Sequence, residues 1–241
     1  MYDEIAEVYK QIFKGPDNFH TFCQELIPKN KLINILDIGC GPGTQIKRFA
    51  EDGHNTLGID PSREMIETAG IENNFKVMSL EELPELSHTT DQKFDFIYCI
   101  GNTLSYLSTA DQVPVFEAIY HLLNKGGVFL IQIVNWDSIQ IPWDFPPITL
   151  DNGSVFSRKY TQTTPANQTS ATTLDQVLFS TSIVSEETTT NWDARMFPRS
   201  KNDLGNSLVK AGFTVKNTFK NFKRTSWDTQ SGATIVELRK A

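Results

Sequence analysis

The chain has 241 residues, with 22 basic and 29 acidic side chains and a formal net charge of −7. A hydrophobic content of 39%, including 16 phenylalanines, is enough for one large packed domain, or for one domain with a substantial insertion. The acidic balance disfavours nucleic acid as a partner, because proteins that bind a phosphate backbone usually present a basic face.

The cysteines and the apolar runs exclude several further classes. Cys23, Cys40 and Cys99 are far apart and form no C-x-x-C pair, so they predict neither a disulfide framework nor a metal site. No apolar run approaches the roughly 20 residues that cross a bilayer, and the first residues lack the regions of a signal peptide. We therefore expect a cytoplasmic protein without membrane association.

The first half of the chain alternates between helical and strand patterns. Apolar residues at helical spacing predict helices at 3–13 and 17–29, and the run 31–38 predicts the first strand. The elements expected next are helices at 44–51, 61–70 and 111–123, and strands at 54–59, 75–78, 94–100 and 128–134. This alternation is typical of an α/β fold with a doubly wound, mostly parallel sheet.

The pattern changes after Pro147. Residues 148–190 are rich in Thr and Ser, and they alternate polar and apolar side chains, as at 155–160, which predicts antiparallel strands. The last expected elements are a helix at 200–211 and strands at 213–222 and 233–239. We therefore expect one domain formed by residues 1–147 and 196–241, and a β-rich insertion at 148–195 that covers a substrate site.

The segment 35–45 reads Ile-Leu-Asp-Ile-Gly-Cys-Gly-Pro-Gly-Thr-Gln, a glycine-rich turn between a buried strand and a helix. A backbone takes this form where it must approach a ligand closely at the carboxyl end of a strand. Gly39, Gly41 and Gly43 are spaced G-x-G-x-G, whereas dinucleotide-binding loops prefer G-x-G-x-x-G. The N–H groups of the loop and the helix dipole are expected to hold the carboxylate of an amino acid. Asp37 is expected to bind an ammonium group or to order the loop.

Asp60 ends the second expected strand, 21 positions after Gly39. A carboxylate at this place can accept hydrogen bonds from both hydroxyls of an unphosphorylated ribose. The alternative is that Asp60 caps the next helix, since Asp60-Pro61-Ser62 also reads as a helix start. The loop and Asp60 together predict a cofactor that contains a nucleoside.

Four stretches of the chain resemble the successive motifs of class I S-adenosylmethionine-dependent methyltransferases. They are residues 35–45, 57–61 (Leu-Gly-Ile-Asp-Pro), 93–107, and 122–131 with its Leu-Leu-Asn-Lys-Gly-Gly. The resemblance covers residues 31–134 and implies an S-adenosyl-L-methionine-dependent methyltransferase. It also implies a Rossmann-like fold with a seven-stranded sheet whose last strand is antiparallel. Residues 148–195 resemble the variable β-rich insertion of some small-molecule members.

The resemblance also implies which residues bind the cofactor. The position beyond the third strand often holds an acidic residue that meets the adenine amino group, but here it is Ser79, and backbone amides at Ser79 and Leu80 are expected to replace it. No metal ligand is implied. Carried over position by position, the set is Asp37, Gly39, Cys40, Gly41 and Gly43 at the loop, Asp60, Pro61 and Met65 at the ribose and adenine, Ser79, Leu80 and Glu81 after the third strand, and Cys99, Ile100, Gly101 and Asn102 after the fourth.

The methyl acceptor is expected at the segments that follow the fourth and fifth strands. Residues 101–107 and 135–137 are similar to the G-N-S and N-Y-D segments of glycine and sarcosine N-methyltransferases. The alternatives are a local turn role for an asparagine, core packing for a tyrosine and a solvated surface position for an arginine. The candidate catalytic residues are Asn102, Asn135, Tyr9 and Arg195, and the candidates for binding a substrate carboxylate are Arg158, Arg195 and Arg199.

The expected reaction is in-line methyl transfer to a small-molecule acceptor, at an amine nitrogen or a hydroxyl. An amine need only arrive deprotonated, whereas a hydroxyl would require a base. The alternatives are a methyltransferase that acts on protein or RNA, a non-catalytic module that binds S-adenosylmethionine, and an NAD-linked oxidoreductase. The sequence indicates no particular oligomeric state.

Overall fold

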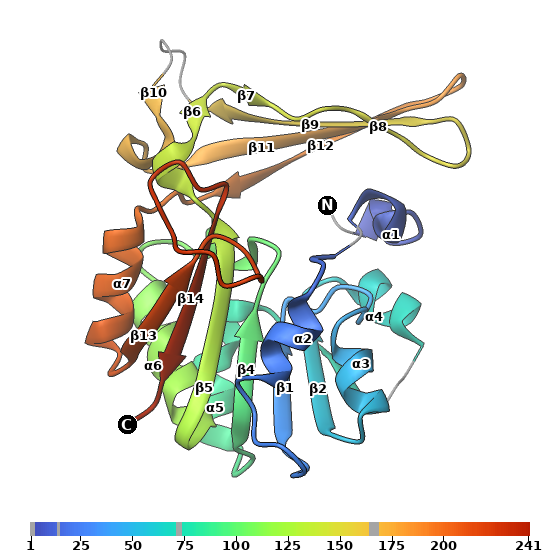
Figure 1. The fold of residues 1–241 in the computed structure, drawn as a ribbon. Coiled ribbons are helices and arrows are strands. Elements are labelled where there is room, and N and C mark those ends of the chain that lie inside the picture. The colour runs from blue at the N-terminus through green and yellow to red at the C-terminus, as the bar shows by residue number, and fades with distance from the viewer. Residues whose placement is uncertain (1–2, 14, 71–73, 164–168) are drawn as a thin grey trace.

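The computed structural model describes residues 3–13, 15–70, 74–163 and 169–241. Its centre is a seven-stranded sheet with the order β13-β14-β5-β4-β1-β2-β3 (Figure 1). The strands are β1 (Asn34–Ile38), β2 (Asn55–Asp60), β3 (Phe75–Val77), β4 (Phe94–Cys99), β5 (Leu123–Val134), β13 (Thr214–Phe219) and β14 (Ala233–Arg239). β1 to β5 are parallel, and β14 is antiparallel to both of its neighbours. The predicted fold class is confirmed.

Helices cover both faces of this sheet. Ile97 and Cys99 of β4 pack into the core on one face, and Phe96 and Tyr98 pack into the core on the other. This two-sided burial explains why β4 is an almost continuous apolar run. The helices are α1 (Tyr9–Ile12), α2 (Phe19–Gln24), α3 (Ile46–Glu51), α4 (Arg63–Ala69), α5 (Leu83–Thr89), α6 (Gln112–Leu122) and α7 (Lys201–Lys210). In the described part of the chain, no helix is both long and apolar enough to cross a membrane.

A set of antiparallel strands lies above the carboxyl edge of the central sheet (Figure 1). They are β6 (Gln140–Ile141), β7 (Trp143–Asp144), β8 (Ile148–Thr149), β9 (Val155–Gln162), β10 (Thr169–Ser170), β11 (Val177–Val184) and β12 (Thr189–Met196). β12, β11, β9 and β7 form one sheet with β8 paired to β9, and β10 pairs with β6. The antiparallel strands therefore begin before residue 148, where the insertion was expected to start.

The N-terminal segment 3–13 joins the two sheets. Its apolar residues pack against Met65 of α4 and Phe156 of β9. The side chain of Gln11 also accepts a hydrogen bond from the backbone N–H of Asp151, with an N–O distance of 2.9 Å. The segment is helical only at Asp3–Ile5 and in α1, rather than throughout as expected.

Candidate active site

Two adjoining cavities lie at the carboxyl edge of the central sheet. The large cavity has a volume of about 690 Å³, and the small cavity has a volume of about 340 Å³. Tyr9, Gly39, Ile100 and Gly101 line both of them. The cavities therefore meet above the ends of β1 and β4, with the N-terminal segment over the junction.

The loop after β1 is held against the end of β2. The N–H groups of Gly39 and Cys40 both donate to the carbonyl oxygen of Ile59, at 2.8 and 3.0 Å. The N–H group of Gly41 donates to Oδ2 of Asp60 at 2.9 Å. These three donors are engaged within the protein, so they are not the N–H groups of the loop that could hold a carboxylate.

Gly39 is required by both its conformation and its surroundings. Its φ is +75°, in the left-handed region that favours glycine. A Cβ at this position would lie 2.5 Å from two side-chain atoms of Thr103. The loop therefore packs closely against the segment that follows β4.

Asp60 lies at the end of β2 and lines the small cavity. Its Oδ1 accepts a hydrogen bond from the N–H of Ser62 at 2.9 Å, and its Oδ2 is held by Gly41. Burial raises the pKa of Asp60, and these two N–H groups oppose the shift. The N-cap of α4 is Ser62, whose hydroxyl oxygen accepts from the N–H of Met65 at 3.1 Å. Asp60 is thus not the helix cap, and Pro61 lies before the helix.

The rest of the small cavity is mainly apolar. Pro61, Met65 and Leu80 line it together with Ser79 and Glu81, as the resemblance implied. The N–H of Ser79 donates to the Glu82 carboxylate at 2.7 Å within a capping box. The amide of Ser79 is therefore already engaged, which corrects the expectation that it meets the adenine.

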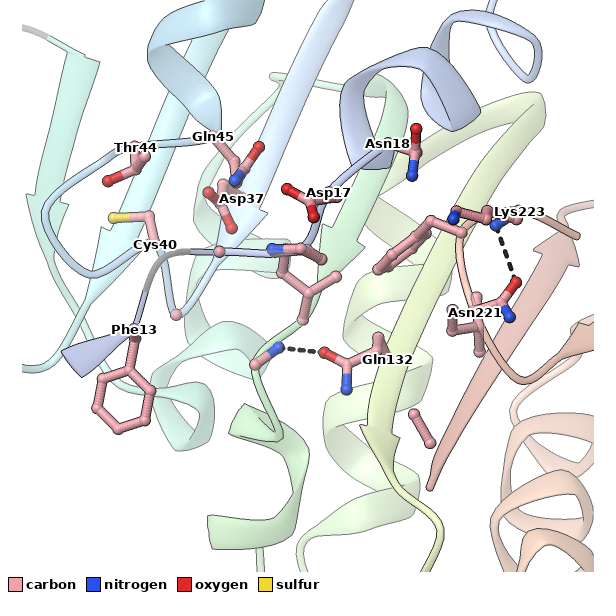
Figure 2. A pocket seen from close by; sticks show the side chains of 18 of the residues that line it. Phe13, Asp17, Asn18, Asp37, Cys40, Thr44, Gln45, Gln132, Asn221 and Lys223 are labelled. Carbon is pink, nitrogen blue, oxygen red and sulfur yellow. Dashed lines mark hydrogen bonds between the residues drawn. The ribbon is translucent and has the colours of Figure 1, made fainter. Parts of the chain in front are cut away.

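The large cavity contains two buried oxygen atoms without a hydrogen-bond partner among the described residues, Asp37 Oδ1 and Gln45 Oε1. Figure 2 shows both side chains at the same end of the cavity. Burial raises the pKa of Asp37 to about 8, the Tyr98 hydroxyl opposes this shift, and the charge of Asp60 adds to it. Buried acceptors without partners are costly. This end of the cavity therefore suits a ligand group that donates several hydrogen bonds, such as an ammonium.

Asn102 lies outside both cavities and has a structural role. Its φ is 68°, and its Oδ1 accepts hydrogen bonds from the Ser105 hydroxyl at 2.6 Å and from the Val134 N–H at 3.1 Å. Its Nδ2 contacts the sulfur of Met196 at 3.6 Å. The side chain joins the ends of β4 and β5 to β12, which places Asn102 in the turn role rather than at the reacting atoms.

Asn135 and Arg195 also lie outside the described linings of both cavities. Asn135 is buried, and its Nδ2 donates to the carbonyl oxygens of Ser231 at 2.8 Å and Thr229 at 3.3 Å. Ala194 lines the small cavity, and since neighbouring residues of a strand face opposite sides, Arg195 faces away from it. Of the four catalytic candidates, only Tyr9 lines the cavities.

Two cofactor candidates of the sequence are packing residues. Gly43 lies beneath the ring of Phe75, which a Cβ would approach to 2.5 Å. Cys99 is fully buried in the core between the sheet and the helices. Neither residue is among those that line the two cavities.

Sequence reasoning missed Gln45 at the loop and two further parts of the large cavity. Gln132 of β5 lines it, and its Oε1 accepts a hydrogen bond from the N–H of Gly101 at 2.7 Å (Figure 2). A polar residue within the buried strand was the signal that marked it. Residues 220–223 also line the cavity, but the strand expected at 213–222 ran through them, whereas β13 ends at Phe219.

Comparison with known proteins gives the class of this domain. The family model for a methyltransferase domain matches residues 35–127. The chain is 27% identical over 154 residues to the putative methyltransferase YqeM of Bacillus subtilis (strain 168), which covers 62% of this chain and 61% of the relative. It is 29% identical over 133 residues to a glycine/sarcosine/dimethylglycine N-methyltransferase of Actinopolyspora halophila, covering 53% of this chain and 21% of the relative. The chain thus spans less than two thirds of either relative.

The fold of the whole chain is similar to that of a solved methyltransferase. A crystal structure of an S-adenosylmethionine-dependent methyltransferase from Clostridium acetobutylicum ATCC 824 is similar with a TM-score of 0.76, at 16% identity, over 100% of this chain and 99% of that chain. At this identity the likeness shows the fold. Residues 35–127 therefore form a methyltransferase domain, within the Rossmann-like fold of S-adenosylmethionine-dependent methyltransferases. The methyltransferase domain expected from the sequence is thus matched by the family model over residues 35–127, and the predicted Rossmann-like fold is confirmed.

Proposed function

We propose that this chain transfers the methyl group of S-adenosylmethionine to the amine nitrogen of a small molecule. The observation that carries the proposal is the unpartnered pair of acceptors, Asp37 Oδ1 and Gln45 Oε1, in a cavity that adjoins Asp60. An amino acid joined to a nucleoside has an ammonium for the first site and ribose hydroxyls for the second. The volume of the large cavity, about 690 Å³, is within the range of small-molecule sites.

The residues divide between the two ends of the cofactor. Asp60 would bind the ribose, since each of its oxygens accepts one backbone N–H and keeps further lone pairs. Pro61, Met65 and Leu80 would contact the adenine. Asp37 and Gln45 would accept hydrogen bonds from the ammonium of the methionine part.

Catalysis in this proposal depends on alignment and on exclusion of water. When bound, S-adenosylmethionine supplies a methyl group activated by its sulfonium, which passes to the acceptor nitrogen and leaves S-adenosylhomocysteine and a proton released to solvent. Tyr9, over the junction of the cavities, would shield the reacting atoms. The sheet of β12, β11, β9 and β7 would close the site, because Ala194 of β12 lines the small cavity.

An amine acceptor is favoured over a hydroxyl for two reasons. A hydroxyl needs a base in the transition state, whereas an amine is a nucleophile once it is neutral. The buried carboxyl of the large cavity, Asp37, is assigned to the cofactor ammonium in this proposal. The Actinopolyspora relative is also named for N-methylation.

Calorimetry and a turnover assay test the proposal. S-adenosylmethionine is expected to bind with a micromolar dissociation constant, and NAD is expected not to bind. Tight NAD binding without S-adenosylmethionine binding would overturn the cofactor assignment. A panel of small amines and small alcohols, followed by release of S-adenosylhomocysteine, tests the acceptor. Turnover with alcohols alone, or with protein or RNA alone, would overturn the amine assignment.

A further inference from the structure

We propose that the loop between β13 and β14 forms an anion-binding subsite for the methyl acceptor. The acceptor would then be an amine that carries a carboxylate or phosphate group, held at the end of the large cavity away from Asp37. This inference rests on the proposed function and names the class of acceptor for the same site.

The loop forms one wall of the large cavity. Lys220, Asn221, Phe222 and Lys223 all line it. Figure 2 shows Asn221 and Lys223 on the side opposite Asp37. The cavity is therefore bipolar, with acidic groups at one end and amide and ammonium groups at the other.

Lys223 is the main positive charge of this wall. Its side chain is exposed, and within the described residues it forms no ion pair. Lys220 is partly neutralised, because its Nζ lies 2.9 Å from the carboxylate of Asp228. The acids that line the cavity are Asp37, on the side away from Lys223, and Asp17, which lies between the two in Figure 2.

Amide donors add to this wall. The Oε1 atom of Gln132 is fixed by the N–H of Gly101, so its Nε2 is left as a donor. The Oδ1 atom of Asn221 likewise accepts from the N–H of Lys223 at 2.9 Å, which leaves its Nδ2 as a donor. Ammonium and amide donors on one wall match the acceptor oxygens of a carboxylate or phosphate.

The loop is held in place before any ligand binds. Phe222 is buried, and its ring centroid lies 5.1 Å from that of Phe19 and 5.4 Å from that of Phe22. At its other end the loop is held by Asn135, through the carbonyl oxygen of Ser231. A subsite on fixed backbone loses little entropy when it binds. Asn135 thereby acts as a positioning residue for the loop between β13 and β14.

Within the described residues, the three arginines expected to bind a substrate carboxylate do not supply this charge. Arg199 is buried and donates to the carbonyl oxygen of Leu107, and Arg195 faces away from the small cavity. The guanidinium of Arg158 lies over the rings of Phe13 and Phe145, at 5.1 and 4.6 Å. The carboxylate-binding role expected of these arginines passes to the opposite wall.

The test uses the protein saturated with S-adenosylhomocysteine, titrated separately with acetate and with inorganic phosphate. The backbone amide signals of residues 220–223 are followed by nuclear magnetic resonance. We expect saturable shifts with at least one of these anions, and Lys223→Gln should weaken that binding about tenfold, as expected for loss of a charge-assisted hydrogen bond. The matched control is Lys216→Gln, at an exposed position of β13 that does not line the cavity, and it should change nothing.

The outcomes separate the two proposals. If S-adenosylhomocysteine does not bind the wild-type protein, the proposed function falls. If it binds but neither anion shifts these signals, or Lys223→Gln leaves anion binding unchanged, the subsite is overturned and the proposed function stands. If Lys223→Gln weakens the binding of S-adenosylhomocysteine itself, Lys223 serves the cofactor carboxylate, and the acceptor subsite is again overturned.

Discussion

The two cavities of the site differ in how their polar groups are satisfied. In the small cavity, both oxygens of Asp60 accept backbone N–H groups, one from Gly41 and one from Ser62. In the large cavity, Asp37 Oδ1 and Gln45 Oε1 have no hydrogen-bond partner among the described residues. The carboxylate oxygens of Asp60 in the small cavity therefore have hydrogen-bond partners before a ligand binds. The two oxygens of the large cavity gain partners only when a ligand binds.

This contrast predicts unequal responses to mutation. A change at Asp60 removes supports of the loop as well as ligand contacts, so stability and binding should fall together. A change at Asp37 removes an oxygen, Oδ1, that has no partner among the described residues, so binding should fall much more than stability.

The largest effect is expected for Asp60→Ala. Loss of two hydrogen bonds to a charged group, at about 1.5 kcal/mol each, should weaken S-adenosylhomocysteine binding about 100-fold. The free energy of unfolding should fall by about 2 kcal/mol, because the N–H groups of Gly41 and Ser62 lose their acceptor. Calorimetry and denaturant titration measure the two effects. The control, Asp91→Ala, changes an exposed carboxylate outside the site; an equal loss of affinity there would contradict the assignment.

Gly39→Ala is expected to have the largest effect on stability alone, whereas Asp60→Ala lowers stability and binding together. Its left-handed φ and the 2.5 Å approach to Thr103 should together cost about 3 kcal/mol in the free energy of unfolding. Gly101→Ala is the matched variant, since Gly101 has a φ of +73° but open space around its Cβ, and it should cost about 1 kcal/mol. Denaturant titration of both variants separates steric overlap from backbone strain. Equal losses would show that Thr103 is not the constraint.

Asn102→Ala should lower the free energy of unfolding by about 2 kcal/mol, because the part-buried Val134 N–H and the buried Ser105 hydroxyl lose their acceptor. Asn102→Gly keeps the left-handed φ accessible and so isolates the lost hydrogen bonds. Thermal unfolding followed by circular dichroism compares the two. If both variants are as stable as the wild type, the proposed tie between β4, β5 and β12 is absent.

The smallest effect concerns a proton at Asp37. Its pKa of about 8 means that the free carboxyl is largely protonated at pH 7. A bound ammonium favours the ionised form of Asp37, so binding of S-adenosylhomocysteine should release up to one proton from this carboxyl. The affinity for S-adenosylhomocysteine should therefore fall as the pH falls below 8. Calorimetry at pH 7 in two buffers with different ionisation enthalpies, neither of them phosphate, measures this proton from the difference in binding enthalpy. Asp37→Asn should abolish the difference, and buffer-independent enthalpy in the wild type would contradict the account.

The same carboxyl predicts how stability depends on pH. Its pKa is higher in the folded protein than in the unfolded chain, so the folded state binds more protons between about pH 4 and pH 8. The stability it contributes is complete at low pH and is lost as pH rises through 8. Asp37→Asn should remove this decline, as denaturant titration across the range will show.

The cofactor half of the site was predictable because its residues are contiguous and their types follow from backbone geometry. Gly39 must be glycine at its φ, and Asp60 must end a strand beside the loop. The acceptor half was not predictable in the same way. Gln132 and Lys223 come from two separate segments, and nothing in the fold requires their residue types, whereas Tyr9 was named as a candidate from the resemblance.

The errors have physical causes too. Asn102 and Asn135 follow strand ends, where catalytic groups often lie, but each is buried and engaged by local backbone groups. The strands β6 and β7 have two residues each, too short for a period of two to be visible in sequence. The mostly parallel, seven-stranded sheet followed from the β-α alternation and the family resemblance.

The central claim is that the two cavities hold opposite ends of one S-adenosylmethionine. Calorimetry with S-adenosylhomocysteine and with methylthioadenosine, which lacks the amino-acid end, tests it on Asp60→Ala and Asp37→Asn. The account predicts that Asp60→Ala weakens both ligands alike, whereas Asp37→Asn weakens S-adenosylhomocysteine about tenfold and leaves methylthioadenosine unchanged. Equal weakening of both ligands by Asp37→Asn, or no binding of either ligand to the wild type, would contradict it.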